Sequence, residues 1–133
     1  MEVREGMSEV VLTVGPGHSL RDAARMMTER KVGAAIVIDE EFPGPHVISE
    51  RDVLVSVGRG QDPDVERVAD HMSDSVITAS PEWSLERAAA EMAGRGIRHL
   101  LVTDGGELAG VLSMRDIMRV WTSAGATSAM SPG

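Results

Sequence analysis

The apolar residues in the first half of the chain predict a fixed order of short elements. Val10–Val14 is rich in β-branched residues and predicts a strand. Ser19 belongs to the residue types that cap helices, and the apolar residues after it recur at helical spacing. The nearly continuous apolar run Ala34–Ile38 predicts a buried strand, Val47–Ser49 a third strand, and Arg51–Val57 a closing helix. The predicted order is β-α-β-β-α.

The second half of the chain predicts the same order. His99–Thr103 is another nearly continuous apolar run, Leu108–Ser113 predicts a third strand, and Arg115–Trp121 predicts a closing helix. Gly33 and Gly96 lie near the ends of the two predicted first helices, where glycine commonly ends a helix.

The residues themselves repeat as well as the pattern. The segment that begins at Ser19 matches the segment that begins at Ser84, at an offset of 84 − 19 = 65 residues. The first members of the pairs identical at this offset are Val3, Met7, Ser8, Val11, Thr13, Pro16, Ser19, Leu20, Ala23, Ala24, Met27, Arg30, Val37 and Asp39. The offset then becomes 64, because the first copy has one more residue in the loop EEFPGPH. At that offset Val47, Ser49, Arg51 and Asp52 match Val111, Ser113, Arg115 and Asp116.

A single copy could not cover both faces of its sheet, so the copies are expected to pack together. We therefore predict an α/β (α+β) fold of two tandem β-α-β-β-α repeats, packed sheet to sheet with approximate two-fold symmetry. The expected boundaries are 1–64 for the first repeat with its linker, 65–122 for the second repeat, and 123–133 for a flexible C-terminal tail.

Composition removes several classes of function. The chain has 133 residues and no cysteine, which excludes disulfides, thiolate metal sites and a cysteine nucleophile. Its net charge of −8 argues against general binding of nucleic acid. No apolar run approaches the roughly 20 residues of a membrane helix, and the charged residues 1–6 lack the apolar core of a signal peptide. We expect a cytoplasmic protein with no nucleic-acid or membrane partner.

The duplicated pattern resembles the CBS-domain pair, also called a Bateman module, over about residues 3–121. In the first copy it is carried by VREGMSEVVLTVGPGHSLRDAARMM, VGAAIVID and VISERDVL. In the second copy it is carried by VADHMSDSVITASPEWSLERAAAEM and GIRHLLVTDGGELAGVLSMRDIM. The resemblance implies a stand-alone regulatory sensor that needs no cofactor. It would bind AMP, ADP, ATP or S-adenosylmethionine in clefts between the copies, signal to a protein target that the sequence does not name, and form a homodimer.

The resemblance also implies a ribose-binding signature, a Ser or Thr followed three residues later by Asp. Here it reads Ser49-x-x-Asp52 and Ser113-x-x-Asp116. A carboxylate can accept hydrogen bonds from two adjacent ribose hydroxyls, and the N-terminus of a helix favours anions. The predicted nucleotide-binding residues are Thr13, Val32, Gly33, Ala34, Ala35, Ser49, Arg51, Asp52, Thr78, Ile97, Arg98, His99, Leu100, Ser113, Arg115 and Asp116.

Each group in this set has an expected role. Arg51 and Arg115 would pair with phosphates. Backbone groups of residues 32–35 and 97–100 would line the adenine pocket, and the two threonines would lie near the mouth of the cleft.

The two copies differ around the signature. The second copy keeps a glycine before the third strand, Gly110, which is usual in the family, whereas the first copy has Pro45-His46. Gly33-Ala34 in the first copy corresponds to Arg98-His99 in the second, so we expect two unequal sites. His99 fits either a satisfied core imidazole or a ligand contact.

Other interpretations stay open. Both Ser-x-x-Asp segments also fit a helix capping box, which is compatible with ligand contact. A ligand-independent dimerisation or protein-interaction module would have the same fold, and Trp121 lies where dimers often form in this family. No Ser-His-Asp or paired-carboxylate arrangement is found, and the four histidines lack the spacing of a metal site, so we expect neither catalysis nor a metal.

Overall fold

The computed structural model describes residues 1–41, 45–73 and 77–130, with side chains up to Ser123 in the last helix. The chain forms two compact units. The first unit is Val11–Val76, and the second unit combines Met1–Val10 with Ile77–Gly133. The units thus follow the packing of the chain, whereas the expected boundary at residue 64 follows the repeat in the sequence.

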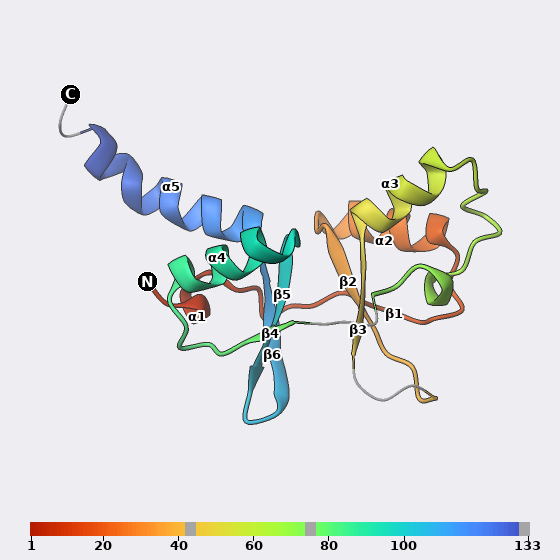
Figure 1. The fold of residues 1–133 in the computed structure, drawn as a ribbon, viewed down its shortest axis with the longest axis horizontal. Helices are drawn as coiled ribbons and strands as arrows, with labels where there is room; N and C mark the ends of the chain where they lie inside the picture. Colours follow the sequence, from red (N-terminus) through yellow and green to blue (C-terminus); the bar gives the residue numbers. More distant parts are fainter. Residues whose placement is uncertain (42–44, 74–76, 131–133) are drawn as a thin grey trace. The chain divides into compact units, whose positions relative to one another are not determined.

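The first unit has a three-stranded sheet in the order β1-β2-β3, with β1 parallel and β3 antiparallel to β2 (Figure 1). Its elements are β1 (Thr13–Val14), α2 (Leu20–Arg30), β2 (Ala34–Val37), β3 (His46–Ser49), α3 (Glu50–Gly58) and the short 3₁₀ helix η1 (Val68–Asp70).

The second unit repeats this topology in the order β4-β5-β6. Its elements are α1 (Val3–Gly6), β4 (Thr78–Ala79), α4 (Leu85–Arg95), β5 (His99–Asp104), β6 (Glu107–Ser113) and α5 (Met114–Met130). The predicted fold class, an α/β chain of two tandem β-α-β-β-α repeats, is confirmed. The sequence pattern did not predict α1 and η1.

Helices α2 and α4 both begin at the serine of their repeat, but different residue types end them. The hydroxyl groups of Ser19 and Ser84 cap α2 and α4, each accepting a backbone N–H three residues later. Gly96 ends α4 in the left-handed conformation, with φ of 66°. Gly33 lies near the end of α2, as expected, but Lys31 adopts the left-handed conformation two residues earlier, with φ of 57°. A side chain there costs about 1 kcal/mol relative to glycine.

The last helix is longer than predicted. The closing helix was expected to end at Trp121, whereas α5 runs to Met130. Residues 122–130 contain several alanines and no proline, so nothing in them breaks a helix sharply. The expected flexible tail, 123–133, extends outside the described residues and stays a prediction. So does the loop at 40–46, because residues 42–44 are not described.

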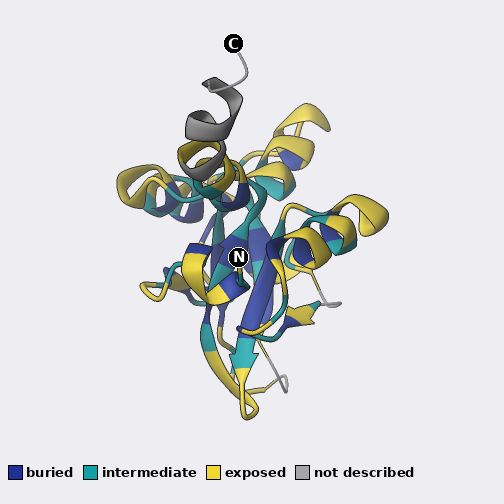
Figure 2. Ribbon diagram, turned by 90° about the vertical axis from the view of Figure 1, so that its left-hand side faces the viewer, coloured by how far each residue is buried: buried dark blue, intermediate teal, exposed yellow. Residues whose placement is uncertain are grey.

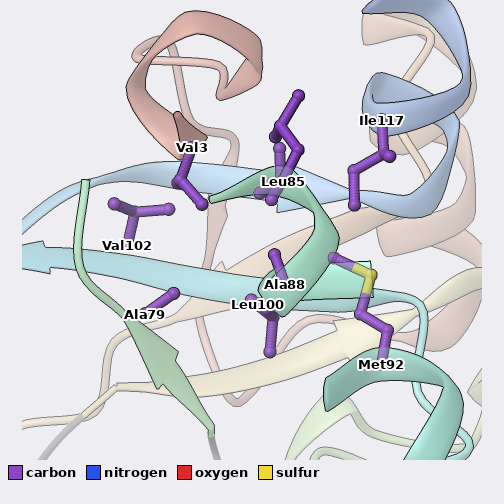
Figure 3. Close-up of a cluster of buried hydrophobic side chains, with 9 residues drawn as sticks. Val3, Ala79, Leu85, Ala88, Met92, Leu100, Val102 and Ile117 are labelled. Atoms are coloured by element: carbon purple, nitrogen blue, oxygen red, sulfur yellow. The ribbon is translucent and has the colours of Figure 1, made fainter. Parts of the chain in front are cut away.

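Each unit buries one face of its sheet under its helices. In Figure 2 the middle parts of the strands and the inner sides of the helices are buried, while the outer turns of the helices and the tip of the β5–β6 hairpin are exposed. The cluster of the first unit consists of Leu12, Val14, Leu20, Ala23, Met27, Ala35, Val37, Ile48 and Val68. The cluster of the second unit consists of Val3, Ala79, Leu85, Ala88, Met92, Leu100, Val102, Leu112 and Ile117 (Figure 3).

One valine in each cluster belongs, by sequence, to the other repeat. Val3 of α1 is fully buried beside Leu85 over the second sheet (Figure 3), and its N–H donates to the carbonyl of Trp83 at 2.8 Å. In the first unit Val68 of η1 is equally buried, and its N–H donates to the carbonyl of His18 at 2.9 Å. The segment that precedes the first strand of one repeat therefore completes the core of the other repeat.

Among the described residues, none of the helices has both the length and the apolar character needed to cross a bilayer.

The buried position of Val3 gives a first prediction. Val3→Ala should lower the free energy of unfolding by about 2 kcal/mol, because it opens a cavity in a closed cluster. Val10→Ala is the matched control, since Val10 is 76% exposed and its loss should change stability by less than about 0.5 kcal/mol. Chemical denaturation of both variants measures the difference. Equal, small effects would show that α1 is not part of the core.

Candidate functional site

The first Ser-x-x-Asp segment forms the junction between β3 and α3. Ser49 is the N-cap of α3, and its N–H and hydroxyl both donate to Oδ2 of Asp52, at 2.8 and 2.9 Å. The N–H of Asp52 in turn donates to Oγ of Ser49 at 3.3 Å. This closed ring is the predicted capping box, and it fixes one carboxylate oxygen of Asp52 at the positive end of the helix.

The second segment forms the same junction between β6 and α5. The N–H of Ser113 donates to Oδ2 of Asp116 at 2.9 Å, and the N–H of Asp116 donates to Oγ of Ser113 at 3.0 Å. Both aspartates are half-buried. The two junctions are therefore near copies of one another in separate units.

Backbone hydrogen bonds tie each junction to the start of the central strand. The N–H of Glu50 donates to the carbonyl of Gly33 at 2.9 Å. In the second unit the N–H of Met114 donates to the carbonyl of Arg98 at 2.8 Å. Predicted residues that are distant in sequence are thus brought together within each unit.

The register of the sheets decides which side chains share a face with the serine. Ala34 lies directly opposite Ser49, and Thr13 is paired with the next β2 residue on that same face, Ile36. Ala35 belongs to the buried cluster under the helices, and side chains alternate along a strand. Thr13, Ala34 and Ser49 therefore lie on the face of the sheet that the helices of the first unit do not cover.

The second unit repeats this arrangement. His99 lies directly opposite Ser113, and Thr78 is paired with Leu101 on the same face. Leu100 points into the buried cluster, so only its backbone could contact a ligand on the opposite face.

The remaining predicted residues surround these faces. Val32 and Ile97 are half-buried and pack against the clusters of their units. Arg51 and Arg115 are exposed in the first turns of α3 and α5. Cationic side chains at these positions lie close to the helix starts, where an anion is favoured.

A third Ser-x-Arg-Asp segment occurs at Ser19–Asp22, where it begins α2. Asp22 makes a hydrogen bond with Arg25 at 3.3 Å. The hydrogen bond from Arg25, followed by that from Ser19, holds the pKa of Asp22 below its usual value. This segment has the same local sequence as the two junctions but does not follow the third strand of a sheet. It provides an internal comparison for them.

The departure from the family pattern at Pro45-His46 does not change the register. His46 begins β3 opposite Val37, and the N–H of Ser73 donates to the carbonyl of Val47 at 2.8 Å. In the second unit the N–H of Ser8 donates to the carbonyl of Val111 at 2.9 Å. A segment from outside the sheet thus pairs with the third strand in both units.

The two units make room for this segment differently. A Cβ atom on Gly110 would lie 2.5 Å from the carbonyl oxygen of Ser8, so only glycine fits there. His46 occupies the equivalent position in the first unit. It is buried, with Nδ1 at 3.3 Å from the carbonyl oxygen of Ser73. The side chain that replaces glycine therefore contacts the segment directly.

The described residues contain no group of three or more His, Asp or Glu side chains that could hold a metal ion. His71 instead pairs with Glu66 at 2.8 Å, and the ring of His18 accepts a hydrogen bond from the N–H of Gly15.

Comparison with known proteins decides the family. The sequence profile of the CBS domain matches residues 2–58 and again residues 65–123. The chain belongs to the CBS-domain family.

Individual relatives are similar over most of this chain. An uncharacterized protein of Methanopyrus kandleri is 33% identical over 112 residues, which cover 83% of this chain and 57% of that protein. The chain thus spans little more than half of this relative's length. A hexameric CBS-CP12 protein from bloom-forming cyanobacteria has a TM-score of 0.82 and 28% identity, covering 90% of this chain and 71% of that one.

A CBS domain protein from Pyrobaculum aerophilum was solved as a complex with AMP. It has a TM-score of 0.76 and 28% identity, and the match covers 92% of this chain and 99% of that chain.

Sequence reasoning missed one residue at the second junction. Nη2 of Arg119 lies 3.5 Å from Oδ1 of Asp116 and donates to the carbonyl of Gly6 at 3.4 Å. The spacing of an Asp and an Arg three residues apart on a predicted helix could have indicated this pair.

The close approach at Gly110 gives a second prediction. Gly110→Ala should lower the free energy of unfolding by about 2 kcal/mol, because the backbone of Ser8 must move away from β6. Gly94→Ala on α4 is the matched control, since nothing lies within 4 Å of the added atom. It should be neutral or stabilising by up to about 1 kcal/mol. Thermal or chemical denaturation would contradict this account if the two variants unfolded alike.

Proposed function

We propose that this CBS-domain chain is a non-enzymatic, cytoplasmic regulatory module. It binds an adenine nucleotide or adenosyl ligand, namely AMP, ADP, ATP or S-adenosylmethionine, and passes the signal to a protein target. The predicted position of the ligand between the two repeats is part of this proposal. The net charge of −8 supports the absence of nucleic acid from the partners.

The observation that carries the proposal is the geometry of the duplicated Ser-x-x-Asp junctions. In each junction Oδ2 of the aspartate is fixed by the serine, which orients Oδ1 away from the cap. A carboxylate held in this way can accept hydrogen bonds from ribose hydroxyls. The AMP complex of the Pyrobaculum relative, which matches nearly the whole chain, supports the choice of ligand class.

Binding of the ligand is predicted to depend on the negative charge of these aspartates. The double variant Asp52→Asn, Asp116→Asn keeps an oxygen for the caps but removes both charges. It should weaken AMP binding by at least about tenfold, because hydrogen bonds to a charged group contribute roughly 1.5–3 kcal/mol. Isothermal titration with the four ligands measures the change.

Asp22→Asn is the matched control, because it makes the same exchange in the third Ser-x-Arg-Asp segment and should leave binding unchanged. The proposal fails if none of the ligands binds at millimolar concentration. It also fails if the double variant binds as well as the original protein.

We further propose that the module is a homodimer. Apolar side chains are exposed on the outer faces of both closing helices, at equivalent positions of the repeat. Leu54 and Val57 of α3 are 70% and 49% exposed, and Met118 and Trp121 of α5 are 56% and 38% exposed. Exposed apolar patches of this kind commonly mark protein interfaces. The hexameric cyanobacterial relative is itself an assembly of several chains.

Charges on these faces should dissociate the dimer. The double variant Leu54→Glu, Met118→Glu should have the mass of one chain by light scattering, since burying two carboxylates is unfavourable. Val65→Glu is the control. Val65 is 65% exposed but lies outside both helices, so its replacement should leave the dimer intact. A single-chain mass for the original protein would contradict the proposal.

The same apolar faces favour a second candidate function, a protein-interaction module that works without a ligand. The two candidates are separated by measuring the mass with and without AMP, together with the titration above. An assembly that forms normally in a protein with no measurable affinity for any of the four ligands favours the second candidate.

A further inference from the structure

The two Ser-x-x-Asp junctions differ in what surrounds the aspartate. In the second unit Arg119 stands three residues after Asp116, and its Nη2 lies 3.5 Å from Oδ1. The equivalent residue of the first unit, at the offset of 64, is Val55. Within the described part of the chain, Oδ1 of Asp52 has no hydrogen-bond or ion-pair partner, whereas Oδ1 of Asp116 faces a guanidinium group.

The guanidinium group of Arg119 is held from two sides. Besides Asp116, it donates to the carbonyl of Gly6 at the end of α1. A ribose hydroxyl that approached Oδ1 of Asp116 would therefore have to displace a cation that the N-terminal segment helps to position. An exposed ion pair of this kind shifts an equilibrium only a few-fold, so Arg119 by itself weakens the second site, and its closure requires a second difference.

The second difference lies across the strand from the serine. Directly opposite residues of an antiparallel pair have Cβ atoms roughly 5 Å apart. The methyl group of Ala34 therefore lies beside Ser49, while the half-buried imidazole of His99 lies beside Ser113. The side chain next to the serine is therefore much larger in the second unit than in the first.

We propose that the protein binds one adenosyl ligand per chain, at the junction of the first unit, and that His99 and Arg119 keep the second junction from binding. This inference rests on the proposed function, because it assumes that adenosyl ligands bind to these junctions. Asp52 is then the working ribose anchor, and Asp116 serves to cap α5.

The repeat itself supplies the variants that test this inference. Isothermal titration with AMP should give a stoichiometry of one, and Asp52→Asn should abolish the heat of binding while Asp116→Asn leaves it unchanged. The double variant His99→Ala, Arg119→Val places the residues of the first unit into the second, and it should raise the stoichiometry to two. Arg25→Val removes the equivalent arginine of the Ser19–Asp22 segment and should leave the stoichiometry at one.

The possible outcomes separate this inference from the proposed function. Two equal sites in the original protein, or binding that depends on Asp116 and not on Asp52, would overturn the inference alone. A stoichiometry that stays at one in the folded double variant would overturn the role of His99 and Arg119. The absence of any AMP binding would overturn the proposed function together with the inference. Circular dichroism of each variant confirms that the fold is kept.

Discussion

Each core of this protein depends on one buried valine that its own sheet and long helices do not supply. Val3 and Val68 are both fully buried, and each belongs to a segment that precedes the first strand of the other repeat. Burying a valine side chain stabilises a fold by roughly 1.5–3 kcal/mol, a sizeable part of the 5–15 kcal/mol that stabilises a typical domain. The same segments donate hydrogen bonds to the turns that precede α2 and α4, so the starts of those helices depend on them too.

The site depends on a second constraint, the register of the antiparallel pairs. Because Ser49 and Ser113 are the last residues of β3 and β6 and also begin the closing helices, one residue fixes both the end of a strand and the start of a helix. A slip of one residue would turn each serine toward the buried cluster. Gly110 in one unit and His46 in the other keep this register by different means, one by leaving space for a neighbouring backbone and the other by contacting it.

The duplication made most of the fold predictable, because a pattern that occurs in two diverged copies is more reliable than one that occurs once. The strands, the capped helices and both Ser-x-x-Asp junctions follow from apolar spacing and from residue types that favour caps. The end of α2 did not follow, because Lys31 takes a conformation that glycine takes at the equivalent position. The packing of α1 and η1 did not follow either, because short helices carry little periodic signal and their partners lie across the repeat boundary. The spacing of Arg119 from Asp116 carried a local signal, but its contact with Gly6 did not follow from the sequence because it is a tertiary one.

Because each repeat supplies a segment to the core of the other, the two units can be completed only one after the other during synthesis. The first unit is one continuous stretch, so all of its residues have been synthesised once residue 76 has been added. The core of the second unit is incomplete until α5 has been made, because Ile117 of α5 is fully buried in its cluster. Val3 therefore stays without its final neighbours while the first unit is already complete. One half of a nascent chain can thus fold while Val3 and the other residues of α1 still lack the partners that bury them.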